Sequence, residues 1–245
     1  MLDLTTVVVV SLAVFAGAFV SGLAGFAFSA VAGTVLLHIF PAQEAVPLMM
    51  VCSVVIQAIN LWGLRQSIHW SGSIPLIVGG FFGVQIAVYL LQTIDTHFLR
   101  LCFGALVALY AAYMLFRPGI AWASAGAADK YTAALIGCGG GLVGGLTAMP
   151  GAVPTIWCDI RGVSKEGQRG LVQPFIATMQ VFAIALLLGQ QSFSPKIAVD
   201  LVVSVPAMLA GVTLGIAAFR HVDDSAFRKI ILVMLLLSGG ALVFV

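Results

Sequence analysis

Long apolar runs, interrupted by short polar breaks, fill almost the whole of this 245-residue chain. Hydrophobic residues make up 61% of it and charged residues only 8%, whereas a soluble domain carries about 25% charged residues. So few charges could not cover the core of a water-soluble fold of this length. We therefore predict an all-α polytopic membrane protein, because the runs are longer than the strands of about ten residues that build outer-membrane barrels.

The polar breaks divide the chain into ten segments. Most are long enough for a hydrocarbon core of about 30 Å, which needs about 20 helical residues. Two are short, and the shorter one, 151–160, would span only about 15 Å. Whether the short segments, 26–40 and 151–160, cross fully or form re-entrant hairpins stays open. The predicted segments are 5–20, 26–40, 43–62, 72–90, 97–116, 131–148, 151–160, 170–189, 196–218 and 226–245.

The two halves of the chain resemble each other on either side of a polar stretch. Matching residues keep the same order in both halves, which indicates duplication of a five-segment unit. We place the first membrane repeat at residues 1–120, a linker at 121–130 and the second repeat at 131–245. The matching pairs are Gly22 with Gly145 and Gln57 with Gln180 at an offset of 123, and Gly83 with Gly211 at an offset of 128.

The basic residues indicate how the two repeats are oriented. Five is an odd number, so the second repeat should be inverted relative to the first. Ten segments place nine Lys and Arg on one side and two on the other, and the larger group marks the cytoplasmic side. Eight spans would give only seven against four. We expect inverted repeats in the inner (plasma) membrane, with both termini on the non-cytoplasmic side. The nine are Arg65, Arg117, Lys130, Arg161, Lys165, Arg169, Arg220, Arg228 and Lys229, and the two are Arg100 and Lys196.

The sequence "GCGGGLVGGLTAMPGAVP", residues 137–154, places seven glycines and two prolines inside an apolar run. Non-helical backbone at membrane depth is tolerated only where it is buried in protein or lines a wet cavity. Many secondary transporters build a central site from interrupted helices at equivalent places of inverted repeats. We expect this tip to meet the first-half tip, "SGLAGF" at 21–26, near the midplane, where half-helix N–H groups bind an anion. Close packing of small residues is the alternative.

Polar side chains within the segments are candidate donors to that anion. Gln57 and Gln180 hold equivalent positions, and their carboxamides could converge on an anion or simply bond between helices. Tip hydroxyls could bind substrate or return to their own helix, and Arg169 could supply charge or anchor its helix at the interface. The predicted substrate-binding residues are Gly22, Gly25, Phe26, Ser29, Gln57, Asn60, Gly145, Thr147, Pro150, Gly151, Thr155, Gln173 and Gln180, with Arg169 at the cavity mouth.

Other classes of function find little support in the sequence. A net charge of +2 without a basic run argues against nucleic acid. No G-x-x-x-x-G-K-[ST] or H-E-x-x-H motif occurs, and no serine has a deep histidine or lysine as a base. The four cysteines lie in apolar segments without a C-x-x-C pair, as small buried hydrophobes do. We expect no enzyme, no cofactor and no metal site.

Three stretches, "FVSGLAGFAFS", "GCGGGLVGGLTAMPGAVPTIW" and "RGVSKEGQRG", resemble the sulfite exporter TauE/SafE family, and the likeness covers nearly the whole chain. The resemblance implies a secondary transporter, expected to export sulfite, organosulfonates or related small anions by alternating access. The alternative is a non-transporting membrane subunit, or a permease partner of a larger complex. The anion, the direction, coupling to a proton or another ion, and assembly into a homo-oligomer all stay open.

Overall fold

The computed structural model of this protein describes residues 4–25, 27–64, 68, 70–93, 95–116, 129–161, 163, 165–189, 195–219 and 236. These residues form helices joined by short turns, with no strand among them. The helices are α1 (Leu4–Ala24), α2 (Phe28–Ile39), α3 (Ala42–Leu64), α4 (Trp70–Leu91), α5 (Thr96–Phe116), α6 (Lys130–Thr147), α7 (Ala152–Ile160), α8 (Lys165–Gly189) and α9 (Pro195–Phe219).

The first nine predicted segments are confirmed as helices, with most ends within two residues of the expected position. The largest difference is at α8, which begins at Lys165 rather than at residue 170. The tenth segment, 226–245, lies outside the described residues except for Leu236, and so does the linker up to residue 128.

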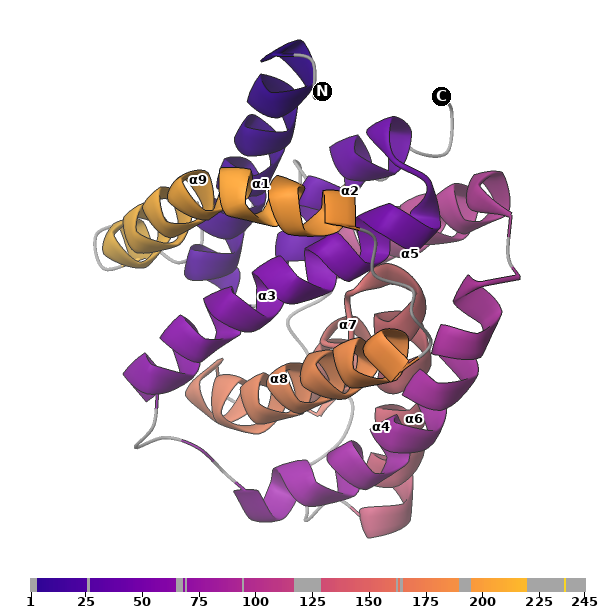
Figure 1. Cartoon of the computed structure of the whole chain (residues 1–245). Helices are drawn as coiled ribbons and strands as arrows, with labels where there is room; N and C mark the ends of the chain where they lie inside the picture. Colours follow the sequence, from indigo (N-terminus) through magenta and orange to yellow (C-terminus); the bar gives the residue numbers. More distant parts are fainter. Residues whose placement is uncertain are drawn as a thin grey trace.

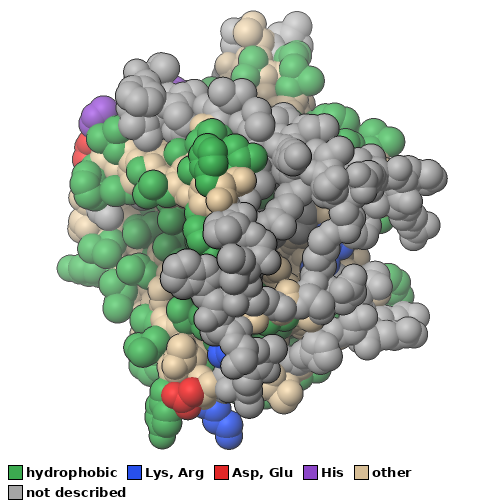
Figure 2. All heavy atoms as spheres, turned by 180° about the vertical axis from the view of Figure 1, so that it is seen from behind, with side chains coloured by type: hydrophobic (Ala, Val, Ile, Leu, Met, Phe, Trp, Pro, Cys, Tyr) green, Lys and Arg blue, Asp and Glu red, His purple; other side chains and the backbone are tan. Residues whose placement is uncertain are grey.

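Several of the described helices have the length and surface of membrane spans. Four of them are long and apolar enough to cross: Thr5–Leu23, Ala42–Trp62, Trp70–Leu91 and Gly167–Gly189. Hydrophobic side chains cover most of the coloured surface in Figure 2, and charged ones appear only at a few places. On α4 one face is exposed and apolar while the opposite face is buried, as expected between lipid and protein. The exposed face carries Ile74, Val78, Phe82 and Ile86.

Two helices are too short to cross. At 1.5 Å per residue, the 12 residues of α2 span about 18 Å and the 9 residues of α7 about 14 Å. Each packs against the long helix before it, so that α1 with α2 and α6 with α7 form two helical hairpins. A reversal of the chain at Gly25 and at Ala148 separates the two helices of each pair.

The hairpins lie in different parts of the molecule (Figure 1). Helix α1 packs along α9, and α6 packs along α4, while α3 and α8 contact each other between these two groups. Glycines allow both close helix pairs, because an added Cβ would collide with the partner's backbone or Cβ atoms. The glycine contacts of one helix pair recur in the other, with one partner shifted by 123 residues and the other by 128. Gly83 meets Cys138 as Gly211 meets Phe15, and Gly145 meets Ala87 as Gly22 meets Gly215.

Candidate polar site between the two tips

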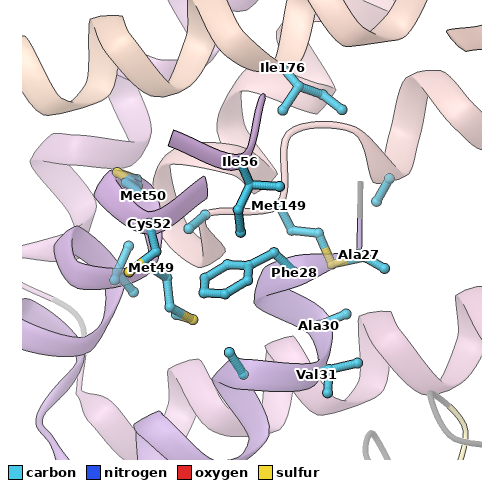
Figure 3. Packing of buried hydrophobic residues seen from close by; sticks show 14 of the residues in the cluster. Ala27, Phe28, Ala30, Val31, Met49, Met50, Cys52, Ile56, Met149 and Ile176 are labelled. Carbon is cyan, nitrogen blue, oxygen red and sulfur yellow. The ribbon is translucent and has the colours of Figure 1, made fainter. Parts of the chain in front are cut away.

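The tips of the two hairpins touch at the centre of the described core. The Ser29 hydroxyl, in the first turn of α2, donates to the Ala148 carbonyl at the end of α6, with an Oγ–O distance of 2.7 Å. Met149 of the second tip belongs to the same buried cluster as Ala27 and Phe28 of the first (Figure 3). The two hairpins, far apart in sequence, therefore meet at their turns, as the sequence predicts.

The backbone turns in a similar way at both tips. Gly25 has a φ of +89° and Ala148 a φ of 55°, and no other described residue has a positive φ. The two residues are 123 positions apart, the offset that also relates Gln57 to Gln180. Each turn ends a long helix, whose last carbonyl groups lack partners within the helix. These carbonyls need donors from elsewhere because the site is buried.

Side-chain donors from α2, α3 and α8 supply them. The Gly25 carbonyl accepts from Nε2 of Gln57 at 3.2 Å and from Nε2 of Gln173 at 2.7 Å. The Ala148 carbonyl accepts from Nε2 of Gln180 at 3.3 Å as well as from Ser29. Thus Gln57 and Gln180 each donate to a carbonyl 32 residues away in their own half.

The same carboxamides also connect the two halves. Gln180 on α8 donates to the Ser53 hydroxyl on α3 at 2.7 Å, and Gln173 reaches across to Gly25. Spacings of three and four residues place the polar side chains of each helix on one face. The α3 face carries Ser53, Gln57 and Asn60, and the α8 face carries Arg169, Gln173 and Gln180.

Several polar atoms in this region have no hydrogen-bond partner although they are buried. Such an atom costs about 1–3 kcal/mol, so a site that keeps several of them is one where a ligand or water would be expected as the missing partner. Three of them are the Oε1 atoms of the glutamines, whose side chains are at most 3% exposed. The unpartnered atoms are Oε1 of Gln57, Gln173 and Gln180, Nδ2 of Asn60, and Oγ of Ser21 and Oγ1 of Thr155.

Arg169 reaches inward from the second turn of α8. Its guanidinium donates to the Leu23 carbonyl in the last turn of α1, and its Cζ would lie 3.8 Å from a Cβ on Gly25. No basic residue lies in the last turn of α1 itself. Because a helix C-terminus carries about half a negative charge, this contact stabilises α1 and places a positive charge at the first tip.

The remaining predicted residues lie around the tips in other roles. Gly22 and Gly145 lie in the contacts of α1 with α9 and of α6 with α4. The Thr147 hydroxyl returns to its own helix, donating to the Val143 carbonyl at 2.6 Å. Pro150 packs on Gly144, the Gly151 carbonyl accepts from the Thr155 amide, and Phe26 lies outside the described residues. In the described part of the chain no three His, Cys, Asp or Glu side chains form a metal-binding group.

Sequence reasoning did not select two serines, Ser53 and Ser21. Ser53 joins α3 to Gln180, and the Ser21 hydroxyl is buried without a partner. A single serine in an apolar helix carries no distinguishing signal, since most such hydroxyls bond within their own helix. Only the position of Ser53 opposite Gln180 identifies it.

Apolar spans of this length around a buried polar centre define a multi-pass membrane protein. The family model of the sulfite exporter TauE/SafE matches residues 9–242, and the chain belongs to that family. Its members are membrane transporters for sulfite-type anions rather than enzymes. Comparisons with curated proteins and with solved structures give no match.

Proposed function

We propose that this protein is a secondary transporter that moves a small anion, such as sulfite or an organosulfonate, by alternating access at the two tips. Membership of a family of sulfite-type anion transporters supports the substrate class. The observation that carries the proposal is the contact between the tips, where Ser29 of one hairpin bonds Ala148 of the other inside an apolar core.

The mechanism requires two inverted repeats, and the corresponding contacts support them. Pairs of glycine contacts repeat at the offsets of 123 and 128, and α1 packs on α9 as α6 packs on α4. The positive φ angles of Gly25 and Ala148 and the hydrogen bonds of Gln57 and Gln180 follow the same correspondence. Inverted repeats of this kind rock against each other around a fixed central site in many secondary transporters.

Several donors support anion binding at the tips. Helix α2 begins at a buried residue, and its N-cap, Ala27, provides no side-chain cap, so its first N–H groups lack partners from the helix. Arg169 supplies positive charge to the first tip, and the carboxamides of Gln57 and Gln173 each donate one N–H to Gly25 and have a second N–H to offer. Nδ2 of Asn60 is a buried donor without a partner. Together these groups fit an anion with several oxygens better than a cation or an apolar solute.

We assign the described conformation to an occluded state. The side chains of Gln57, Gln173 and Gln180 are 0%, 3% and 2% exposed, so an anion at these groups would be shielded from both sides. Release would require the halves to separate on one side at a time. The bonds from Gln180 to Ser53 and from Ser29 to Ala148 join the halves and would break in that motion.

Transport by the purified chain in liposomes tests the proposal. Uptake of sulfite, an organosulfonate, a carboxylate and sulfate should be measured at several pH values, with protein-free liposomes as the control. Saturable flux of sulfite or the organosulfonate by this single chain would support the proposal and exclude a subunit that needs a partner. Absence of flux for every anion in the panel would contradict it.

A further inference from the structure

The second tip gathers neutral, oxygen-bearing groups around the Ala148 carbonyl. Ser29 Oγ lies 2.7 Å from this carbonyl oxygen, and Nε2 of Gln180 lies 3.3 Å from it. Ser53 Oγ lies 2.7 Å from the same Nε2. These groups come from α2, α3, α8 and the end of α6, and their side chains are at most 2% exposed. The cluster is therefore buried, uncharged and shared by both halves.

Rotation of the Gln180 carboxamide by half a turn would change what this cluster can bind. The rotation exchanges Oε1 with Nε2, two atoms of nearly equal size. Oε1 is buried without a partner, so it gives up no hydrogen bond when it turns, whereas Nε2 gives up its bonds to Ser53 and Ala148, which contacts of a bound cation would have to replace. Afterwards the Gln180 oxygen would lie beside the Ala148 carbonyl and the Ser53 hydroxyl, with the Ser29 hydroxyl on the far side of the same carbonyl. The hydroxyls of Ser29 and Ser53 can each turn a lone pair toward a cation placed among these oxygens, because a serine oxygen accepts as well as donates.

We propose that this cluster binds Na⁺, with the Ala148 carbonyl, the two serine hydroxyls and the Gln180 oxygen as ligands. Backbone carbonyls at the ends of broken helices bind monovalent cations in other transporters. Divalent cations prefer carboxylates, and the four proposed ligands are neutral. The oxygens lie at hydrogen-bond distances from their neighbours, so any cation must push them apart, and Na⁺, being smaller, requires less displacement than K⁺.

The electrostatics of the two tips differ in a way that supports this assignment. At the first tip the Arg169 guanidinium already compensates the negative end of α1. The residue equivalent to Arg169, 123 positions earlier in the chain, is Val46, which is apolar and buried. The second tip therefore receives no positive charge from this position. Helix α6 has no basic residue in its last turn either. A mobile cation at the end of α6 would therefore supply the charge that Arg169 supplies at the end of α1.

Such a site would couple the ion to the anion, and this step rests on the proposed function. Without the cation, Gln180 directs an unpartnered oxygen away from Ala148, and that oxygen repels a neighbouring anion. With Na⁺ bound, the same position holds an N–H₂ group, which attracts the anion. Binding of Na⁺ should thus raise the affinity for the anion, and by linkage the anion should raise the affinity for Na⁺ by the same factor.

Binding of radioactive sodium to the purified full chain tests the site directly. We expect saturable binding that excess unlabelled Na⁺ displaces and that K⁺ or choline does not. Ser29→Ala and Ser53→Ala should each weaken binding by about tenfold or more, because each removes one ligand from a buried site. The matched control is Ser73→Ala. This variant removes another buried hydroxyl, which donates to the Leu171 carbonyl with an Oγ–O distance of 2.8 Å. Ser73 is not part of the cluster at the second tip, so the variant should leave sodium binding unchanged.

Each result separates the ion site from transport itself. No saturable sodium binding, or equal loss in the Ser29, Ser53 and Ser73 variants, would overturn the site. Displacement by K⁺ as effective as by Na⁺ would overturn the assignment to the smaller cation. If anion flux persists unchanged in choline buffer without sodium binding, the ion site is wrong while the proposed transport stands. If sodium binds as expected and no anion is moved, the proposed transport fails while the site stands.

Discussion

The Gln180 carboxamide holds three parts of the molecule together, because it donates to Ser53 on α3 and to Ala148 at the second tip while its backbone belongs to α8. Replacing it with leucine keeps the approximate volume and removes both bonds. We expect Gln180→Leu to lower the initial rate of anion flux by about tenfold or more. The substitution takes a hydrogen-bond donor from two buried acceptors, and each lost bond costs about 1–3 kcal/mol. Flux into liposomes at equal protein content measures this effect.

Gln85 provides the matched control for that substitution. It lies on α4, and its side chain is exposed on the surface of the described fold. Gln85→Leu should therefore leave the flux at the wild-type rate. Equal flux through the Gln180 and Gln85 variants would show that the Gln180 carboxamide takes no part in transport.

Gly25 combines a backbone angle and a contact that only glycine satisfies. Its φ of +89° is unfavourable for other residues, and a Cβ would lie 2.6 Å from Nε2 of Gln173. We expect Gly25→Ala to destabilise the protein by about 1–3 kcal/mol and to slow transport. Thermal unfolding in detergent measures the first effect. Gly189→Ala is the control, because its Cβ would meet nothing within 4 Å; a similar fall in both melting temperatures would contradict this account.

Some of the candidate site could be predicted from the sequence, and other parts required the contacts. The offset of 123 identified Gln57 and Gln180 as a pair, and both occupy corresponding hydrogen bonds. The roles of Ser53 and Leu23 could not be predicted, since a hydroxyl or a backbone carbonyl gains its role only from what packs opposite. Which residues contact the anion stays a prediction.

At the scale of the helices, the apolar runs predicted position and length because lipid requires both. An apolar run marks only the part of a helix that lies in lipid, so the polar start of α8 was not predicted. "KEGQRG" is polar and ended the apolar run, yet it forms the first turns of a helix that extends beyond the apolar span. The packing of α4 on α6 and of α1 on α9 depends on glycines whose partners lie far away in sequence, so no local pattern could specify it.

The α4–α6 contact yields a prediction of its own. A Cβ on Gly141 would lie 2.2 Å from the Gly80 carbonyl oxygen, so Gly141→Ala must push the two helices apart. We expect a loss of about 1–3 kcal/mol, measured as a lower midpoint of thermal unfolding. Gly139→Ala, two residues away on α6, is the control, because its Cβ would make an ordinary 3.6 Å contact with Val153. That variant should be neutral or slightly more stable, since alanine favours helices over glycine. Equal destabilisation by both would show that helix spacing is not the cause.

At the scale of the whole molecule, two helix pairs face each other across α3 and α8 (Figure 1). A rigid pair on each side and a polar contact between them suit a rocking motion, because the apolar packing within each pair need not change. Only the few hydrogen bonds at the tips would exchange partners. The orientation of the two pairs in the membrane decides whether such a motion can open the site to opposite sides.

Inverted repeats predict that equivalent helix starts lie on opposite sides of the membrane. Thr5 near the start of α1 and Asp129 before α6 hold nearly equivalent positions, and both side chains are exposed. In a variant whose cysteines are all replaced by alanine, we expect Thr5→Cys to react with a membrane-impermeant maleimide added outside intact cells. Asp129→Cys should react only after the cells are opened, because the excess of Lys and Arg places that end in the cytoplasm. Preserved flux in the cysteine-free variant shows that its fold is intact. Labelling of both positions from the same side would mean parallel repeats, and the two tips could then not open alternately to opposite sides by the motion proposed above.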